Sequence, residues 1–326
     1  MKRLSDRSAD LGARWLLVLL AASLLACSPE APEPAPETAE IPAEAISLLG
    51  EELFRPELDA DALAQLESNL SEAEAMLLAD PQSADALIWV GRRTGYLGRY
   101  RDAIEVFTRG IAEHPDDARF LRHRGHRHLS VRQLTESEAD LAAAAEAVRG
   151  TEDVVEPDGI PNARNQPTST LQSNIWYHLG LARYLQSDFE GALEAYEECL
   201  AVSGNPDMLV ATSYWLYLTL RRLERVEEAE RILEPITADL DIIENSTYRD
   251  LLLLYRGELS PGVLRDDEGE ALDVATLGYG LGTWYLVEGD EAAAFDEYDR
   301  VLESSQWAAF GYLAAEAEMA RLRDPG

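Results

Sequence analysis

A 34-residue period, carried by anchor residues that keep their spacing, constrains this chain more than any other feature of its sequence. When Ala84 is counted as position 1, units begin at residues 84, 118, 173 and 275. Position 8 is occupied by Gly91, Gly125, Gly180 and Gly282, and position 24 by Phe107, Leu141, Tyr196 and Tyr298. Such a period is typical of arrays in which each unit buries its apolar face against its neighbours.

These anchor residues resemble the tetratricopeptide repeat (TPR), a helix–turn–helix unit of this length. The resemblance covers about residues 50 to 322 and implies an all-α solenoid with a C-terminal capping helix near 308–322. It also implies a binding scaffold and not an enzyme, so we expect neither catalytic residues nor a cofactor. The expected clear repeats are near 84–117, 118–151, 173–206 and 275–308, with degenerate repeats near 50–83 and 210–243.

The charge and the cysteine content argue against a nucleic-acid-binding protein, a zinc-binding protein and a disulfide-bonded protein. The 61 acidic residues against 28 basic ones give a net charge of −33, which would repel the phosphates of a nucleic acid. The two cysteines, Cys27 and Cys199, have no zinc-site spacing. Cys199 falls at position 27 of its repeat, where a small buried residue belongs, so no disulfide is expected.

The first 26 residues have the pattern of a signal peptide. A basic start precedes an apolar run at 15–25, which is shorter than the roughly 20 residues that a bilayer span needs. The run ends in Leu24-Leu25-Ala26-Cys27, which resembles the lipobox of bacterial lipoproteins. That resemblance implies cleavage before Cys27, acylation of this residue and, with Ser28 next, a place in the outer membrane facing the periplasm. The alternative is an ordinary signal peptide in which Cys27 is incidental.

Two segments interrupt the helical pattern. Residues 27–45 are rich in Pro, Glu and Ala, and we expect them to be a linker that holds the TPR domain, 46–326, away from the membrane. Residues 152–172 contain four Pro or Gly residues between two clear repeats, so a continuous helix is not expected there. A loop of this length is usually either functional, here as a lid that folds over the binding groove, or disordered.

In TPR proteins, positions 2, 5, 9 and 12 of each first helix line the concave groove, and here they are basic at the N-terminal end and aromatic further on. From Arg92 to Arg132 there are ten arginines and five carboxylates. We therefore predict a groove for a peptide whose acidic part or C-terminal carboxylate meets arginine and whose apolar part meets tyrosine. The candidate residues are Arg92, Arg119, Arg122, His126, Tyr177, Tyr184, Tyr214 and Tyr279.

Other readings of these residues remain open. The arginines can instead pair with the chain's own carboxylates, and the tyrosines can pack between helices. The carboxylate clamp of some TPR proteins is not transferred, since Ile88 and Leu181 break its pattern. A second function is the binding of a glycan or cell-wall fragment on the tyrosines. We expect no metal site, because His126 and His128 point about 200° apart on a helix.

Overall fold

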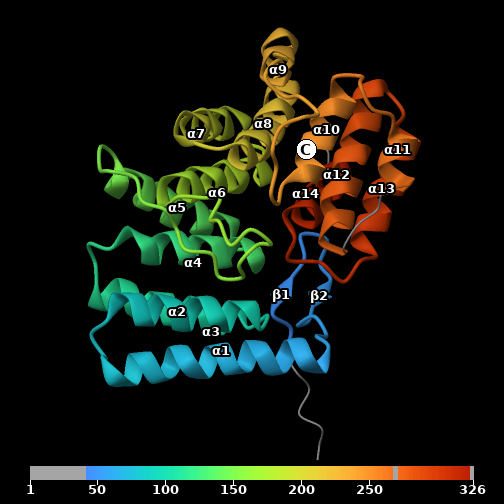
Figure 1. The fold of residues 1–326 in the computed structure, drawn as a ribbon. Coiled ribbons are helices and arrows are strands. Elements are labelled where there is room, and N and C mark those ends of the chain that lie inside the picture. Colours follow the sequence, from blue (N-terminus) through green and yellow to red (C-terminus); the bar gives the residue numbers. More distant parts are fainter. Residues whose placement is uncertain (1–41, 267–270, 324–326) are drawn as a thin grey trace, which may run out of the picture. The chain divides into compact units, whose positions relative to one another are not determined.

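The structure, a computed structural model, describes residues 42–266 and 271–323 (Figure 1). The predicted signal peptide, Cys27 and most of the linker lie outside the described residues. None of the described helices combines the length and the apolar character that a bilayer span requires.

The predicted fold class is confirmed: the described chain is built of helix–turn–helix pairs, with a two-stranded hairpin before them. The hairpin pairs β1 (Ala45–Ile46) with β2 (Glu52–Leu53) in antiparallel register. The helices are α1 (Ala60–Ala79), α2 (Ala84–Tyr96), α3 (Tyr100–Glu113), α4 (Ala118–Ser130), α5 (Leu134–Val148), α6 (Leu171–Leu185), α7 (Phe189–Val202), α8 (Pro206–Arg222), α9 (Val226–Leu233), α10 (Ser246–Tyr255), α11 (Pro261–Asp266), α12 (Ala271–Glu288), α13 (Glu291–Leu302) and α14 (Phe310–Arg323).

Each helix from α1 to α8 packs on the next one along the chain, as repeats of a solenoid do (Figure 1). Many of the first helices begin with a polar cap, for example Ser83 before α2 and Asp117 before α4, whose side chains accept from backbone N–H groups. In the unit expected near 50–83 only the second half is helical, because β2 and Pro56 occupy the first half. Helix α10 packs on α8 and α12 and has no paired helix of its own in the repeat pattern.

Close packing between the two helices of a unit explains the 34-residue period. A Cβ added to Gly91 would lie 2.4 Å from the Phe107 ring, and one added to Gly180 would lie 2.6 Å from the Tyr196 ring. The same clash would arise between Gly125 and Leu141, and between Gly282 and Tyr298. In these four units position 8 must therefore be glycine, so that the side chain at position 24 can fill the space above it.

We expect Gly180→Val to destabilise the protein by about 2 kcal/mol, since overpacking a buried contact typically costs 1–3 kcal/mol. The Tyr196 ring that the new side chain would meet is fully buried. Urea unfolding followed by circular dichroism measures the effect. Gly204→Val is the matched control, because nothing lies within 4 Å of a Cβ at Gly204. Equal losses in the two variants would show that the contact at position 8 does not limit stability.

Capping helix α14 joins the end of the described chain to its beginning and middle. It packs on α12, α13 and α6. The Glu316 carboxylate accepts from Arg132 Nη2 at 2.6 Å and from the backbone N–H of Leu48 at 3.2 Å. Just before α14, Trp307 Nε1 donates to the Phe54 carbonyl at 2.6 Å. The hairpin at 45–53 is thus fixed against the C-terminal helices (Figure 1).

Candidate functional site

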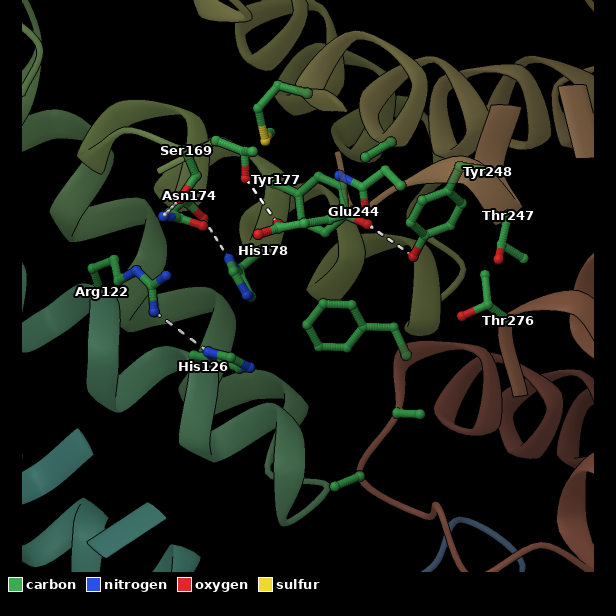
Figure 2. A pocket seen from close by; sticks show the side chains of 17 residues that line it. Arg122, His126, Ser169, Asn174, Tyr177, His178, Glu244, Thr247, Tyr248 and Thr276 are labelled. Carbon is green, nitrogen blue, oxygen red and sulfur yellow. Dashed lines mark hydrogen bonds between the residues drawn. The ribbon is translucent and has the colours of Figure 1, made fainter. Parts of the chain in front are cut away.

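A cavity of about 450 Å³ lies on the inner side of the array, between α4, α6, α8, α10, α12 and the start of α14 (Figure 2). We call it the central cavity. Six side chains define its chemistry: Arg122, His126, Tyr177, His178, Tyr248 and Phe310. Its volume is within the range of pockets that hold small ligands or a few side chains of a peptide.

One wall of the central cavity carries a guanidinium and two imidazoles. Arg122 Nη1 lies 3.4 Å from His126 Nδ1, and the His126 and His178 rings are 4.3 Å apart between centroids. His178 Nδ1 donates to the Asn174 carbonyl at 2.5 Å, which leaves Nε2 as an acceptor in the neutral ring. Burial, and then the neighbouring arginines, hold the pKa of both histidines well below the usual range. The positive charge of this wall is therefore on Arg122, and the imidazoles are neutral.

Aromatic rings adjoin these imidazoles and form much of the remaining lining. The Tyr177 hydroxyl donates to the Tyr248 hydroxyl at 3.2 Å and accepts from Trp215 Nε1 at 2.8 Å. Phe310 lies 5.4 Å from the His178 ring and 6.1 Å from the Tyr177 ring, between centroids. Burial raises the pKa of Tyr177 well above its ordinary value, so its hydroxyl stays neutral.

A buried carboxylate shapes the side of the cavity that precedes α10. Asp207, near the start of α8, accepts from the backbone N–H groups of Ile243, Glu244 and Asn245 at 2.8–3.1 Å. These bonds fix the segment that leads into α10, and therefore the place of Tyr248 in the cavity wall. Glu244 also lines the cavity and accepts from Thr168 Oγ1 at 3.0 Å.

The insertion at 152–172 lies over the arginines of α2 and α4. Glu156 forms an ion pair with Arg122 at 3.0 Å, and the Pro157 carbonyl accepts from Arg92 Nη2 at 2.8 Å. The Gly159 carbonyl accepts from Arg93 at 2.7 Å. The insertion therefore covers the arginines at the basic end of the predicted groove.

The structure brings three of the predicted groove residues, Arg122, His126 and Tyr177, into the central cavity. It places Arg119 outside the cavity, in ion pairs with Asp117 and Asp85 at 2.6 Å each. Arg92 lies under the insertion, as described above. Arg119 therefore pairs with the chain's own carboxylates, as the alternative interpretation of the arginines predicts.

The prediction that Tyr184, Tyr214 and Tyr279 line a groove is wrong, since all three side chains are fully buried in the core. The Tyr184 and Tyr279 hydroxyls are hydrogen-bonded at 2.8 Å, and the Tyr214 ring packs 4.9 Å from that of Tyr248. The physical reason is that α10, α12 and α14 pack against the face of the array that the repeat pattern leaves open.

Sequence reasoning missed His178, Tyr248 and Phe310. His178 is at position 6 of its repeat, outside the positions expected to line a groove. Tyr248 and Phe310 belong to helices outside the 34-residue register, so the period gave no sign of their orientation. Within the described residues, no group of three or more His, Cys, Asp or Glu side chains could hold a metal ion.

Comparison with known proteins gives similarities of modest extent. No family model matches the chain. The chain is 28% identical over 182 residues to the heat-shock protein cognate co-chaperone sgt12 of Aspergillus fumigatus. This match covers 56% of the chain and 46% of sgt12, so the chain spans less than half of that relative's length.

Two solved structures are similar to this one. The first is YrrB, described as a TPR protein with an unusual peptide-binding site: 12% identity, 76% of this chain, 97% of YrrB, TM-score 0.41. The second is a tetratricopeptide repeat protein from Parabacteroides merdae: 12% identity, 78% of this chain, 93% of that chain, TM-score 0.46. The TPR fold of this chain is evident from its own helix pairs and from the packing of position 8 under position 24.

Proposed function

We propose that this protein is a lipid-anchored TPR scaffold of the bacterial periplasm that binds a peptide segment of a partner protein in the central cavity. One observation carries the proposal: a buried arginine and a group of aromatic rings line the same cavity (Figure 2). An arginine can bind a carboxylate through two parallel hydrogen bonds. The aromatic rings offer rigid apolar contact area.

The chemistry of the lining defines the peptide. An acidic side chain or a C-terminal carboxylate would meet Arg122, with the neutral imidazoles of His126 and His178 beside it. An apolar side chain would pack between Tyr177, Tyr248 and Phe310. Because Glu156 already pairs with Arg122, an acidic peptide would compete with the insertion for this guanidinium.

We expect Arg122→Glu to lower the affinity for the partner by about 2–5 kcal/mol, the usual loss when one member of a desolvated charge pair is removed. Affinity purification of the protein from membranes, followed by mass spectrometry, identifies the partner, and titration with its peptide measures the loss. Arg109→Glu is the control, because it makes the same charge change at an exposed position on α3. The same partners at the same affinity in both variants would contradict the proposal.

A glycan or cell-wall fragment is the second candidate ligand, favoured by the aromatic rings and the polar side chains that share the cavity. The dependence of binding on salt concentration distinguishes a peptide ligand from a glycan ligand. A peptide held by its carboxylate at Arg122 should bind more weakly as ionic strength rises, whereas sugar stacked on Tyr177 and Tyr248 should not respond.

The membrane anchor and the periplasmic location are supported by the sequence around Cys27. We expect Cys27→Ser to move the protein from the membrane fraction to the soluble fraction and to abolish labelling with radioactive palmitate, since an acyl chain contributes about 0.8 kcal/mol per buried CH₂. Cys199→Ser is the control, because this buried thiol lies in the repeat core. Membrane association that survives Cys27→Ser would rule out the lipid anchor.

A further inference from the structure

A second, smaller cavity of about 80 Å³ lies beside the central cavity and shares Arg122 and His126 with it. We call it the arginine cavity. Its charged and titratable lining consists of Arg92, Tyr96, Arg122, His123, His126, Arg127 and Glu156. A single water needs about 10–15 Å³ on the same scale, so this space can hold a group of several heavy atoms.

The charges around the arginine cavity do not balance. Among the described residues that line it, three are arginines and Glu156 is the one carboxylate. No carboxylate of the described chain forms an ion pair with Arg127, which contacts the His126 ring at 2.9 Å and the Tyr100 ring at 5.3 Å. Arg92 donates to the Pro157 carbonyl and the Tyr96 hydroxyl, both neutral groups. Among these lining residues the surplus is therefore two positive charges, and the Asp158 carboxylate, which is outside the lining, also interacts electrostatically with Arg92.

Hydrogen-bonding capacity is also left unused. Arg122 is 6% exposed, and its Nε is buried without a hydrogen-bond partner in the described residues. Its Nη2 meets Glu156 at 3.0 Å and its Nη1 meets His123 Nδ1 at 3.1 Å, so Nε is the donor atom that the described residues leave without an acceptor. A buried guanidinium without enough acceptors is costly, whereas an oxyanion would supply both acceptors and charge.

We infer that the arginine cavity binds a small oxyanion of the phosphate class, either inorganic phosphate or the phosphate group of a monoester. A phosphate carries between one and two negative charges near neutral pH, so its charge is opposite to the positive surplus of the lining. The planar donors of arginine match the geometry of its oxygens. The organic part of a monoester would extend into the central cavity, since Arg122 and His126 line both spaces. This inference does not depend on the proposed peptide partner.

Substitution of Glu156 and substitution of an arginine should change the phosphate affinity in opposite directions. Its carboxylate lies on the cavity wall, and its Oε2 has no hydrogen-bond partner in the described residues. A bound phosphate is repelled by this carboxylate and attracted by the arginines. Glu156→Gln should therefore tighten phosphate binding several-fold, while Arg127→Gln should weaken it about tenfold or more, which is 1.4 kcal/mol.

Isothermal titration of the full-length protein in detergent, with inorganic phosphate and with sn-glycerol 3-phosphate, tests the inference. Arg109→Gln, which removes an exposed arginine outside both cavities, should bind as the wild type does. Binding of inorganic phosphate alone points to the free ion, and tighter binding of the monoester points to an esterified ligand; both support the site. The inference would be overturned if neither anion gave a heat of binding at millimolar concentrations. It would also be overturned if the wild type and Arg127→Gln bound phosphate equally well.

The inference can still be tested if one of the variants fails to fold. In phosphate-free buffer Arg127→Gln should melt no lower than the wild type, because it removes a charge that has no carboxylate partner in the described chain. If this variant fails to fold, Glu156→Gln still tests the site through its opposite sign. Phosphate binding that Glu156→Gln leaves unchanged or weakens would then contradict the inference.

Discussion

Replacing Arg132 with methionine is expected to destabilise the protein by about 3–5 kcal/mol, because it leaves a carboxylate buried without its counter-charge. The side chains of Arg132 and Glu316 are 3% and 0% exposed. Arg132 donates to both carboxylate oxygens, at 2.6 and 3.0 Å, and also to the Trp307 carbonyl at 2.7 Å. This pair joins the turn after α4 to the capping helix, so its loss should loosen α14 and the N-terminal hairpin together.

Urea unfolding of three variants separates this effect from a general loss of charge. The double variant Arg132→Met/Glu316→Leu should recover much of the stability, because apolar residues of similar volume often replace a buried pair without loss. Arg149→Met, which breaks an exposed pair with Glu146, should change stability by less than about 1 kcal/mol. A small effect of Arg132→Met, equal to that of Arg149→Met, would show that α14 is held by packing alone.

Trp215→Ala is the second substitution with a large expected effect, about 3–5 kcal/mol of stability. Trp215 on α8 is 1% exposed and packs against the rings of Tyr184, Tyr214 and Tyr279 at centroid distances of 5.2–5.8 Å. Its indole N–H also donates to the Tyr177 hydroxyl, which places the Tyr177 ring in the central cavity. The variant should therefore lose both core packing and the shape of the aromatic lining.

Trp215→Phe distinguishes these two roles. It keeps an aromatic ring but removes the indole N–H, so it should cost about 1 kcal/mol for the hydrogen bond plus the smaller packing loss. Thermal unfolding measures the stability of both variants, and titration with the partner peptide measures binding. Unchanged binding in a folded Trp215→Ala protein would mean that the position of Tyr177 does not matter for the ligand.

The 34-residue period was sufficient to predict the fold because it reports a steric requirement that each unit satisfies separately. A glycine at position 8 under a large side chain at position 24 can be read from one chain, as Gly91 and Phe107 illustrate. Helix α10 and the hairpin at 45–53 could not be placed from this pattern. Their positions depend on contacts with residues far away in the sequence, such as Asp207 and Glu316.

The site was predicted only in part for the same reason. Arg122, His126 and Tyr177 were found because α4 and α6 follow the repeat register. Tyr184, Tyr214 and Tyr279 follow that register too, but helices outside it cover them, so they are core residues. The position of Glu156 at Arg122 could not be inferred, because an irregular insertion has no periodicity from which side-chain direction can be read.

The central claim is that the central cavity receives a peptide, and site-specific photo-crosslinking tests it most directly. A photoreactive amino acid is placed at Thr276 in the cavity wall and, as a control, at Arg109 on the exposed face of α3. After irradiation of membranes, mass spectrometry maps the attached peptide. We predict that one partner segment, acidic or C-terminal, is crosslinked from position 276 and not from 109, and that Arg122→Glu abolishes it. No peptide at 276, or the same peptides at both positions, would contradict the claim.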